Sequence, residues 1–512
     1  MIIFIVNNLI KIINKTNILF FQIVKNLIRI INKTSFFFFQ IEIFNLIHNP
    51  NYSIALMAQG SHSDRKMFYI FLASEYILKI KIFFLKNFCK NNILILDYLD
   101  FLAIILWLRG KFNSSLETFN EQEKYRYKIK NYYLKNAIIK KKSVNYNYYL
   151  PRNTIDVLGL IGHLDAIIKY TKIKKVKYTL NLIGDSNKII NNYFFNLYKK
   201  YINFIEIKKF THEELLLEKI NFKNWHWVMP SLKKHDKLQL CHQTFSEVLL
   251  KWHKKNLGPL IHIKNKENNI EQIKRKLNIP KKKEYVVLHL RSRFYEKNNK
   301  KEEIFRSGNI IDFKETINYL NSLGYYVLFM GGEKKDYVNK IKFNKSMFIN
   351  YSQSSVRSDK NDVIIIKNCK FFIGSNSGPH WIASSLYKKI CLINVPFNRG
   401  FPYYVSCSYL PVKYVKNNKL INIENILRDY SYFNFDSHFK NNGIHLQNNS
   451  SKEILLTIKE FLSDQKIIKN FDSYKDHTER INLFNKKFKY FNHKYDVGIN
   501  GKISSCYIIN NY

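Results

Sequence analysis

The segment 371–386 constrains the fold of this chain more than any other part of the sequence. It passes from a continuous apolar run to small and hydroxyl residues, then to a proline that heads a second apolar run. Pro379 falls at the expected first turn of a helix, where its missing N–H costs nothing. The pattern predicts a buried strand that ends at Gly374, a tight turn and a helix, which together form the repeating unit of a parallel α/β sheet.

Short apolar strands and helices alternate on both sides of this segment. Strands are expected at 154–158, 178–183, 203–207, 285–290, 325–330, 347–350, 370–373 and 390–394. Helices are expected at 187–201, 244–252, 312–323, 362–368, 380–387 and 451–462, and one follows a glycine turn at 159–163. This rhythm predicts an α/β fold with two Rossmann-like, doubly wound parallel-sheet domains that face a cleft.

The flanks of this region differ from it in composition. The stretch that begins at Asn8 recurs almost verbatim from Asn26, a period of 18 residues. It is either translated AT-rich repeat DNA, with Met57 and Met67 as alternative starts, or a structured arm. Five parts are expected: a low-complexity N-terminus at 1–66, an ill-defined helical and apolar lead-in at 67–150, α/β domains at 151–260 and 270–415, and a helical or irregular extension at 416–512.

The turn after the strand at 370–373 is suited to an anion. The free N–H groups and the dipole of a helix start converge on one point, with the hydroxyls of Ser375 and Ser377 beside them. Gly378 permits close approach of the backbone to a ligand. The turn therefore predicts a phosphate site, and the alternative is an ordinary Ser/Gly turn that caps a core helix.

A second group of polar residues ends the strand at 285–290. His289 and Arg291 alternate there, so both lie on one face at its carboxyl end. Ligands of open α/β sheets bind beyond that end, and a guanidinium forms a fork for phosphate oxygens. Arg306 is a further candidate. The alternative is a solvated strand end with a core histidine.

The glycine turn expected at 159–163 carries a histidine. His163, beside Gly162, is a candidate general base because histidine titrates near neutral pH. A structural turn with a surface histidine is the alternative.

These segments together resemble known enzymes. The run Gly374–His380 and the helix after it are similar to the donor-binding turn of heptosyltransferases. The wider stretch 285–397 looks like the donor-binding domain of glycosyltransferases with the two-Rossmann GT-B fold. About 155–510 resembles a family of bacterial glycosyltransferases of surface polysaccharide synthesis. This chain has Ser292 where that family usually has Asp, and Ser307 where it has Asn.

The resemblance implies that a sugar moves from a nucleotide-diphosphate sugar, bound by 270–415, to a glycan or lipid-linked acceptor of the surface polysaccharide or lipopolysaccharide type. It implies catalytic roles for His163, as the base on the acceptor side, and Arg291, which stabilises the leaving diphosphate. The implied substrate-binding residues are Gly162, His289, Arg306, Gly374, Ser375, Asn376, Ser377, Gly378 and His380. No metal and no cofactor are expected, since arginines and helix dipoles neutralise the diphosphate in GT-B enzymes.

Charge supports a rival prediction. A net charge of +44 suits nucleic acid or an anionic membrane, yet Lys, Asn, Ile, Tyr and Phe are enriched together, as an AT-rich genome favours. The aromatic residues fall mainly in apolar-periodic segments, as core residues do, so no specific nucleic-acid partner is expected. A basic RNA-binding protein and a sugar-nucleotide epimerase of the same fold are the alternatives.

Cysteines and hydropathy indicate the compartment. The six cysteines form no C-x-x-C pair, which favours buried free thiols in a reducing cytoplasm. The longest apolar run, 92–108, contains Asp97 and Asp100 and falls short of the roughly 18 uncharged residues of a membrane span, so a buried or surface-lying helix is expected. We expect a cytoplasmic protein, peripheral at the inner membrane face through contact with anionic lipid.

Overall fold

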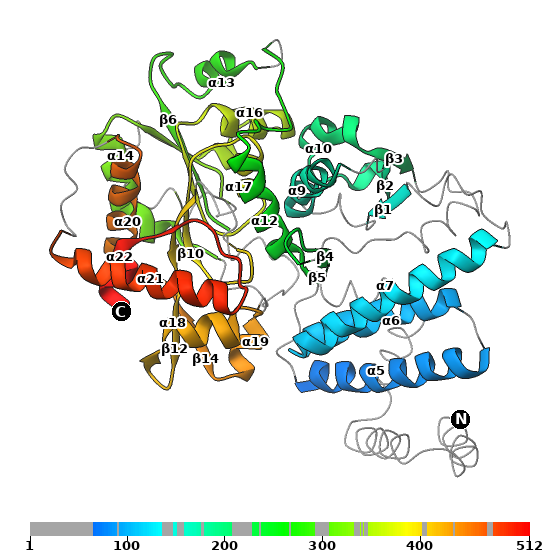
Figure 1. The fold of residues 1–512 in the computed structure, drawn as a ribbon. Helices are drawn as coiled ribbons and strands as arrows, with labels where there is room; N and C mark the ends of the chain where they lie inside the picture. The colour runs from blue at the N-terminus through cyan, green and yellow to red at the C-terminus, as the bar shows by residue number, and fades with distance from the viewer. Residues whose placement is uncertain are drawn as a thin grey trace. The chain divides into compact units, whose positions relative to one another are not determined.

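The computed structural model describes residues 65–89, 92–135, 147–150, 158–175, 179–206, 228–234, 237–265, 268–291, 307–331, 338, 341, 347–401, 407–433, 436–467 and 475–512. The N-terminal repeat, Met57 and the candidate Arg306 lie outside these residues. The chain divides into two compact units, one up to Lys135 and one that contains all the sheets. Each unit is described by itself (Figure 1).

The described part of the first unit consists of helices α5 (Arg65–Phe84), which ends in the π-helical turn η1 (Leu85–Cys89), α6 (Asn92–Leu108) and α7 (Phe112–Lys135). Helix α6 packs against both neighbours and buries Leu99, Ala103 and Trp107, so the prediction of a buried helix at 92–108 is confirmed. The buried carboxylate of Glu75 forms ion pairs with three side chains, those of Lys79, Arg109 and Lys111. None of the described helices has the length and apolar character needed to cross a membrane.

The second unit begins with a parallel sheet in the order β1 (Asn147–Leu150), β2 (Thr179–Gly184), β3 (Asn203–Glu206). Helix α9 (Leu158–Lys174) lies between the first two strands in sequence, and α10 (Asn192–Tyr198), flanked by the 3-10 turns η3 (Ser186–Lys188) and η4 (Lys199–Tyr201), lies between the next two. The strand predicted at 154–158 is wrong at Leu158, which begins α9; its other residues lie outside the described part of the chain. The hairpin of β4 (Val228–Pro230) and β5 (Leu238–Leu240), α12 (Cys241–Lys254) and α13 (Ile270–Lys276) follow.

The larger sheet has seven parallel strands in the order β8, β7, β6, β9, β10, β11, β15. They are β6 (Tyr285–His289), β7 (Tyr326–Phe329), β8 (Phe348–Ile349), β9 (Phe372–Gly374), β10 (Ile390–Val395), β11 (Cys407–Pro411) and β15 (Lys502–Ile503). The chain builds outward from β6 to β8 and then returns to place β9 on the other side of β6. This is the Rossmann order, and the reversal between β6 and β9 is its switch point.

Helices cover both faces of this sheet. Helices α14 (Lys314–Ser322) and α20 (Ser451–Asp464) lie on one face, and α16 (Asp359–Asn368) and α17 (Pro379–Ser385) lie on the other (Figure 1). Coverage of both faces explains why the central strands are apolar throughout. Two of these four helices have side-chain caps at their starts: Ser358 caps α16, and Ser450 forms a capping box with Glu453 at α20. The predicted α/β fold with parallel sheets is thus confirmed.

The C-terminal part contains more regular structure than the single helix predicted there. A small antiparallel sheet joins β12 (Lys413–Lys416), β13 (Lys419–Leu420) and β14 (Ile444–Gln447). The C-terminal part also contains α18 (Ile423–Asn425), η11 (Ile426–Tyr430), α19 (Asp436–Asn441), η12 (Lys475–His477), α21 (Thr478–Lys494) and α22 (Ser505–Asn511). Earlier in the chain, the 3-10 turns η9 (Ile310–Phe313) and η10 (Tyr351–Gln353) precede α14 and α16 respectively. Strand β15 pairs with β11 and so completes the large sheet.

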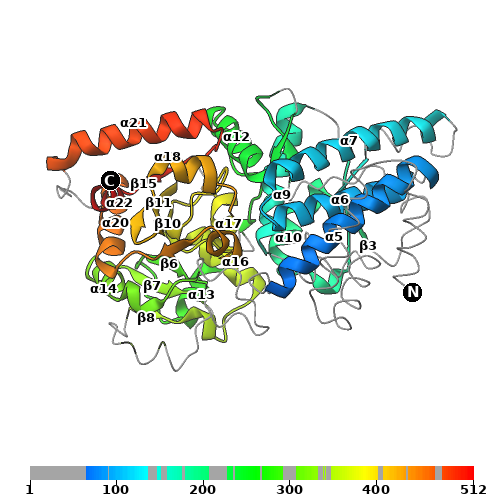
Figure 2. The same cartoon turned by 90° about the horizontal axis from the view of Figure 1, so that it is seen from below.

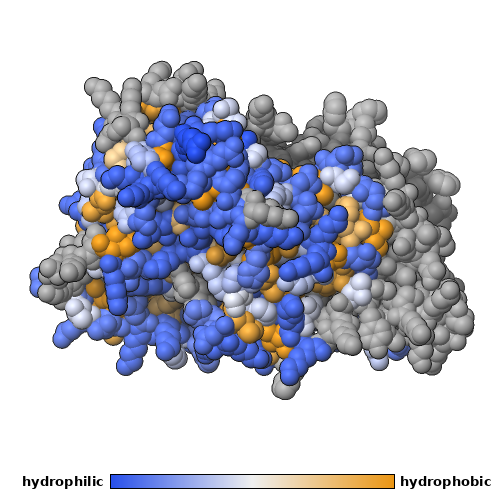
Figure 3. Space-filling view, turned by 90° about the horizontal axis from the view of Figure 1, so that it is seen from above, coloured by the Kyte–Doolittle hydropathy of each residue, from blue (hydrophilic) through white to orange (hydrophobic). Residues whose placement is uncertain are grey.

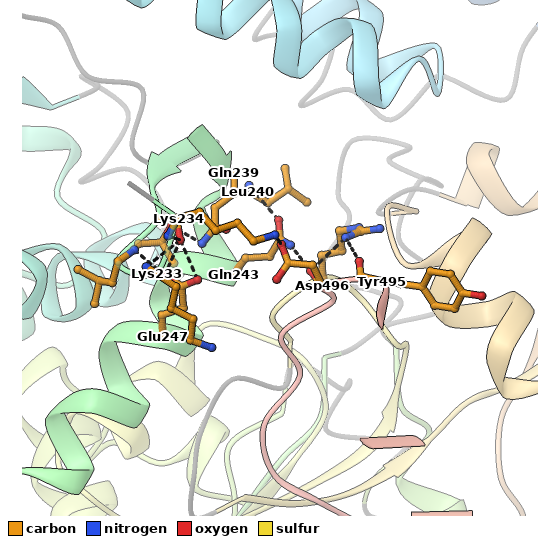
Figure 4. Close-up of polar contacts among 12 residues, drawn as sticks. Lys233, Lys234, Gln239, Leu240, Gln243, Glu247, Tyr495 and Asp496 are labelled. Carbon is orange, nitrogen blue, oxygen red and sulfur yellow. Dashed lines mark hydrogen bonds and ion pairs between the residues drawn. The ribbon is translucent and has the colours of Figure 1, made fainter. Parts of the chain in front are cut away.

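The segment that follows α21 contacts the hairpin of β4 and β5 and helix α12, which lie much earlier in the second unit. The Gln243 side chain on α12 accepts a hydrogen bond from the Leu240 N–H and donates one to the carbonyl of Asp496 (Figure 4). The Asp496 carboxylate pairs with Lys234. Further along, Asn500 donates to the Ser246 hydroxyl at 2.7 Å. These contacts bind the segment after α21 to the hairpin and helix that follow the first sheet.

Surface and core follow the composition. On the face seen in Figure 3, hydrophilic residues predominate and apolar residues form small separate groups. Five cysteines are free and buried, which confirms the expected thiols for Cys241, Cys369, Cys391, Cys407 and Cys506. Burial raises the pKa of the Cys369 thiol to about 12, so this thiol stays protonated at neutral pH.

Candidate functional site

The carboxyl ends of β6 and β9 meet at the switch point of the large sheet. The Ser375 N–H donates to the carbonyl of His289 at 3.0 Å, which extends the pairing of the two strands by one step. The Ser375 hydroxyl accepts from the N–H of Arg291 at 2.9 Å. Ser375 therefore joins the two strand ends and fixes the backbone from which the Arg291 side chain leaves.

His289 contacts the second serine of the turn. Its Nδ1 lies 2.7 Å from the Ser377 Oγ. His289 is partly exposed, but the protein around its ring disfavours the charged form, and the positive charges of Arg357 and Arg291 oppose it as well. Together they lower the pKa of His289 to about 4. The imidazole is therefore neutral near pH 7. Depending on its tautomer, either the Nδ1 proton of His289 or the hydroxyl proton of Ser377 lies in the hydrogen bond between them.

Two N–H groups of the turn are occupied within the protein. Besides Ser375, whose N–H bonds to β6, Ser377 donates its N–H to the Nδ1 of the buried His380 at 3.1 Å. The sequence predicts that the free N–H groups of this turn point at a ligand, and for these two residues that expectation is wrong. Those two N–H groups are therefore not available to a phosphate, and a phosphate at this turn would have to be bound by other groups.

The glycines of the turn are required for packing. A Cβ atom on Gly374 would lie 2.7 Å from the carbonyl oxygen of His289. A Cβ atom on Gly378 would lie 2.9 Å from the Cβ of Leu158, the first residue of α9. Gly374 allows backbone to approach and Gly378 allows the Leu158 side chain to approach, so the sequence-based reason for Gly378, close approach to a ligand, is not the reason that the structure provides. Asn376 lies between the two serines and is partly exposed.

Gly162 and His163 lie inside helix α9, so the glycine turn predicted at 159–163 is wrong. A Cβ atom on Gly162 would lie 2.4 Å from the Cβ of Trp381 on α17, because the two helices cross at this point. His163 is 6% exposed, and its ring centroid lies 4.7 Å from that of Trp381 and 4.9 Å from that of Phe245. The alternative of a surface histidine is therefore wrong too.

The rings around His163 connect it to the serine turn. Trp381 stacks on His380 with centroids 5.8 Å apart, and His380 accepts the N–H of Ser377. The rings of Trp381 and His380 thus lie between His163 and the serine turn. The His163 ring, on α9, packs against Phe245 of α12 and Trp381 of α17. Asp165, two residues on, forms a buried ion pair with Lys169 at 2.6 Å.

Arg357 is a site residue that the sequence prediction does not assign. It is exposed just before Ser358, the cap of α16, at the carboxyl side of β8. Its Nε lies 3.9 Å from a carboxylate oxygen of Asp362, and the other oxygen accepts the Tyr351 hydroxyl at 2.8 Å. After burial, its charge is the largest cause of the lowered pKa of His289. The available signal was the concentration of scarce arginines in this half of the chain.

Arg399 has a structural role instead. It is buried, donates to the carbonyls of Tyr495 at 2.8 Å and Asp496 at 3.1 Å, and lies 3.8 Å over the ring of Tyr432. Arg306, Ser292 and Arg293 fall outside the described residues. Within the ranges that the structure describes, no group of three or more His, Cys, Asp or Glu side chains is arranged to hold a metal ion.

No protein-family model matches the chain, and no curated protein does. Among solved structures it is similar to the ADP-heptose lps heptosyltransferase II of E. coli, with 9% identity, a TM-score of 0.37, and coverage of 63% of this chain and 99% of that one. The glycosyl transferase family 9 protein of Veillonella parvula DSM 2008 has 11% identity, a TM-score of 0.35, and coverage of 62% and 98%. The E. coli heptosyltransferase WaaC with ADP-2-deoxy-2-fluoro heptose has 10% identity, a TM-score of 0.27, and coverage of 51% and 92%. At this distance the reaction has to be argued from the residues of the site.

Proposed function

We propose that this chain is a glycosyltransferase that moves a sugar from a nucleotide-diphosphate sugar to a glycan or lipid-linked acceptor of the surface polysaccharide type. One observation carries the proposal: Ser375, Ser377, His289 and Arg291 converge at the switch point of a Rossmann-ordered sheet. Nucleotide ligands of such sheets bind at this edge. The converging groups are hydroxyls and a guanidinium, which suit the oxygens of a diphosphate.

The neutral state of His289 gives the Ser377 hydroxyl a defined role. When the imidazole proton is on Nδ1, it donates to the Ser377 oxygen, and the hydroxyl proton is then available to a phosphate oxygen. A charged imidazolium would also donate, but the surrounding protein and the positive charges of Arg357 and Arg291 disfavour it, as the low pKa of His289 reflects. In this proposal His289 positions Ser377 and the hydroxyl binds the donor.

Arg291 stabilises the charge that develops as the diphosphate leaves. The Arg291 N–H donates to the Ser375 hydroxyl, so the backbone that carries the Arg291 side chain is held in a defined position at the strand end. A preorganised cation at a leaving group accelerates the reaction more than it tightens binding of the donor. Arg357, which follows β8 two strands away from β6 in the sheet, supplies a second positive charge, and Asp362 lies within ion-pair distance of it.

The acceptor half of the proposal rests on His163 as the base. A transferase has to accept the proton of the acceptor hydroxyl, and the base is expected from the part of the chain that precedes the donor-binding sheet. His163 contacts Trp381 of α17, which adjoins the serine turn. In this proposal the base comes from α9, and its contact with the helix that begins at the serine turn supports the assignment.

The full chain, screened against a panel of nucleotide sugars that includes ADP-heptose, tests the proposal. Thermal unfolding is followed first, since a ligand that binds only the folded state raises Tm, and products are then analysed with a glycan or lipid-linked acceptor. We expect one nucleotide class to raise Tm and to release a nucleoside diphosphate with transfer of its sugar. If the sugar of the bound donor is epimerised and not transferred, the chain is a sugar-nucleotide epimerase and not a transferase. Stabilisation by RNA alone, with a steep salt dependence, would overturn the proposal.

A further inference from the structure

Helix α21 (Thr478–Lys494) has one packed face and one exposed face. On the packed face, Phe484 and Phe488 are buried, and their rings lie near Tyr512 and Phe397, with centroids 4.9 Å and 5.8 Å apart respectively. On the exposed face, Leu483 is 55% and Tyr490 is 59% exposed. Among the described residues of the second unit, these are the largest exposed fractions of large apolar or aromatic side chains. Figure 2 shows the helix along the edge of this unit.

The two exposed side chains form a stripe. Leu483 and Tyr490 are seven residues apart, which is two helical turns, so they lie on the same side. Five cationic residues, Arg480, Lys486, Lys487, Lys489 and Lys494, are exposed on this helix against one acidic residue, Glu479. Of these five cations, only Lys494 has an ion pair with a carboxylate in the described part of the chain, to Glu424 at 3.5 Å. The face is therefore both apolar and strongly positive.

A hollow adjoins this stripe. It has a volume of about 290 Å³. Its lining is mostly apolar, aromatic and cationic (Ile423, Arg480, Leu483, Phe484, Lys487, Phe491 and Tyr512), with Asn422 and one acidic residue, Glu424. Phe484 and Phe491 supply an apolar floor, and Arg480 and Lys487 supply positive charge at its border. A ligand that fits both would have phosphate oxygens next to a hydrocarbon chain.

We propose that the exposed face of α21 binds the surface of an anionic phospholipid membrane. A helix that lies in the membrane interface presents apolar and aromatic side chains to the acyl boundary and lysines to the head groups, which is the arrangement of Leu483, Tyr490 and their neighbours. RNA would engage the cations but would leave Leu483 and the apolar hollow in water. This surface is formed by elements other than the serine turn, so the inference does not depend on the proposed enzymatic function.

Vesicle sedimentation with the full chain tests the inference. Vesicles of phosphatidylcholine with about one third phosphatidylglycerol are compared with pure phosphatidylcholine. The test variant is Leu483→Ser with Lys486→Gln and Lys487→Gln. The matched control is Leu257→Ser with Lys254→Gln and Lys255→Gln, which removes one exposed leucine and two exposed lysines at the end of α12. Every substituted residue is exposed, so both variants are expected to unfold at the temperature of the parent chain.

We expect the parent chain and the control to bind anionic vesicles and the test variant to bind them about tenfold or more weakly, because each lysine near an anionic surface contributes to the attraction. Binding should also fall in high salt and on neutral vesicles. Equal loss in both variants would show that only the total charge matters and would overturn the assignment of α21. Binding of RNA that is lost in the test variant, with no vesicle binding by the parent, would assign the surface to nucleic acid instead.

Discussion

The Ser377 hydroxyl and the His289 Nδ1 lie 2.7 Å apart although the two residues are 88 positions apart in the chain. The contact crosses the switch point of the large sheet, from the end of β6 to the turn after β9. It couples the orientation of one hydroxyl to the protonation of one histidine, and the donor site that we propose depends on that coupling.

The first prediction concerns this hydroxyl. Ser377→Ala removes a hydrogen bond to a charged phosphate and should weaken binding of the matching nucleoside diphosphate about 10- to 100-fold, as measured by calorimetry. Ser384→Ala is the control, since Ser384 lies on α17 away from the turn and lines a separate hollow. Equal affinity in Ser377→Ala and the parent would show that the turn does not contact the diphosphate.

The pKa of His289 predicts how stability depends on pH. In the folded chain the pKa of His289 is about 4, below its ordinary value of 6.5. Between pH 4 and pH 6.5 the unfolded chain therefore binds more protons at this residue than the folded chain does. Stability contributed by this residue is therefore complete above about pH 6.5 and is lost as pH falls toward 4. Urea unfolding at pH 7 and pH 4.5 should show a smaller acid loss in His289→Gln than in the parent. Identical losses in both proteins would mean that His289 is not held neutral.

A pair of glycines in α9 tests the crossing with α17. Gly162→Ala should destabilise the chain by about 1–3 kcal/mol, because the new methyl group overlaps Trp381. Gly159→Ala should be neutral or stabilising by up to about 1 kcal/mol, since its Cβ would meet Trp381 at 3.7 Å, an ordinary contact, and alanine favours a helix. Denaturant unfolding of both variants measures the difference. The crossing is placed wrongly if both substitutions have the same effect.

The role of His163 is tested through turnover. If it is the base, His163→Ala should reduce kcat by about 10²–10⁴-fold and leave the affinity for the nucleoside diphosphate unchanged. Because the ring is packed against Trp381 and Phe245, thermal unfolding of the variant has to be compared with that of Phe245→Leu, which disturbs the same cluster without removing a titratable group. A decrease in kcat below about threefold, or one matched by Phe245→Leu, would make His163 a packing residue.

The features that the sequence predicts well are those with a local signal. The strand at 285–290 is recognised from its unbroken apolar run, and Pro379 marks the start of α17. Strand β15 has two residues and exists through its pairing with Ser408 and Tyr409, so no local pattern announces it. The turn predicted at 159–163 is wrong for a similar reason: two glycines suggest a break in a helix, whereas Gly162 is in the helix because Trp381 occupies the space of a side chain.

The candidate site divides in the same way. His289 and Arg291, and separately Ser375 and Ser377, are predicted because they lie at or just after the end of an apolar strand, and the structure brings the two groups together through two hydrogen bonds. The loss of two N–H donors could not be predicted, because it results from the spacing of β6 and β9 and from the rotamer of His380. The strand at 347–350 is predicted, but Arg357 lies beyond the turn η10 that follows it, so the strand end does not point to this residue.

The most direct measurement is the release of nucleoside diphosphate from the nucleotide sugar that stabilises the parent chain, followed in the parent and in Arg291→Lys. Lysine keeps the charge but loses the fork of donors that fits a diphosphate. The account predicts that the parent releases the diphosphate with transfer of the sugar, and that Arg291→Lys lowers kcat by at least tenfold while the Kd of the donor changes by less than about threefold. The same kcat in both proteins, or no nucleotide sugar that binds the parent, would contradict it.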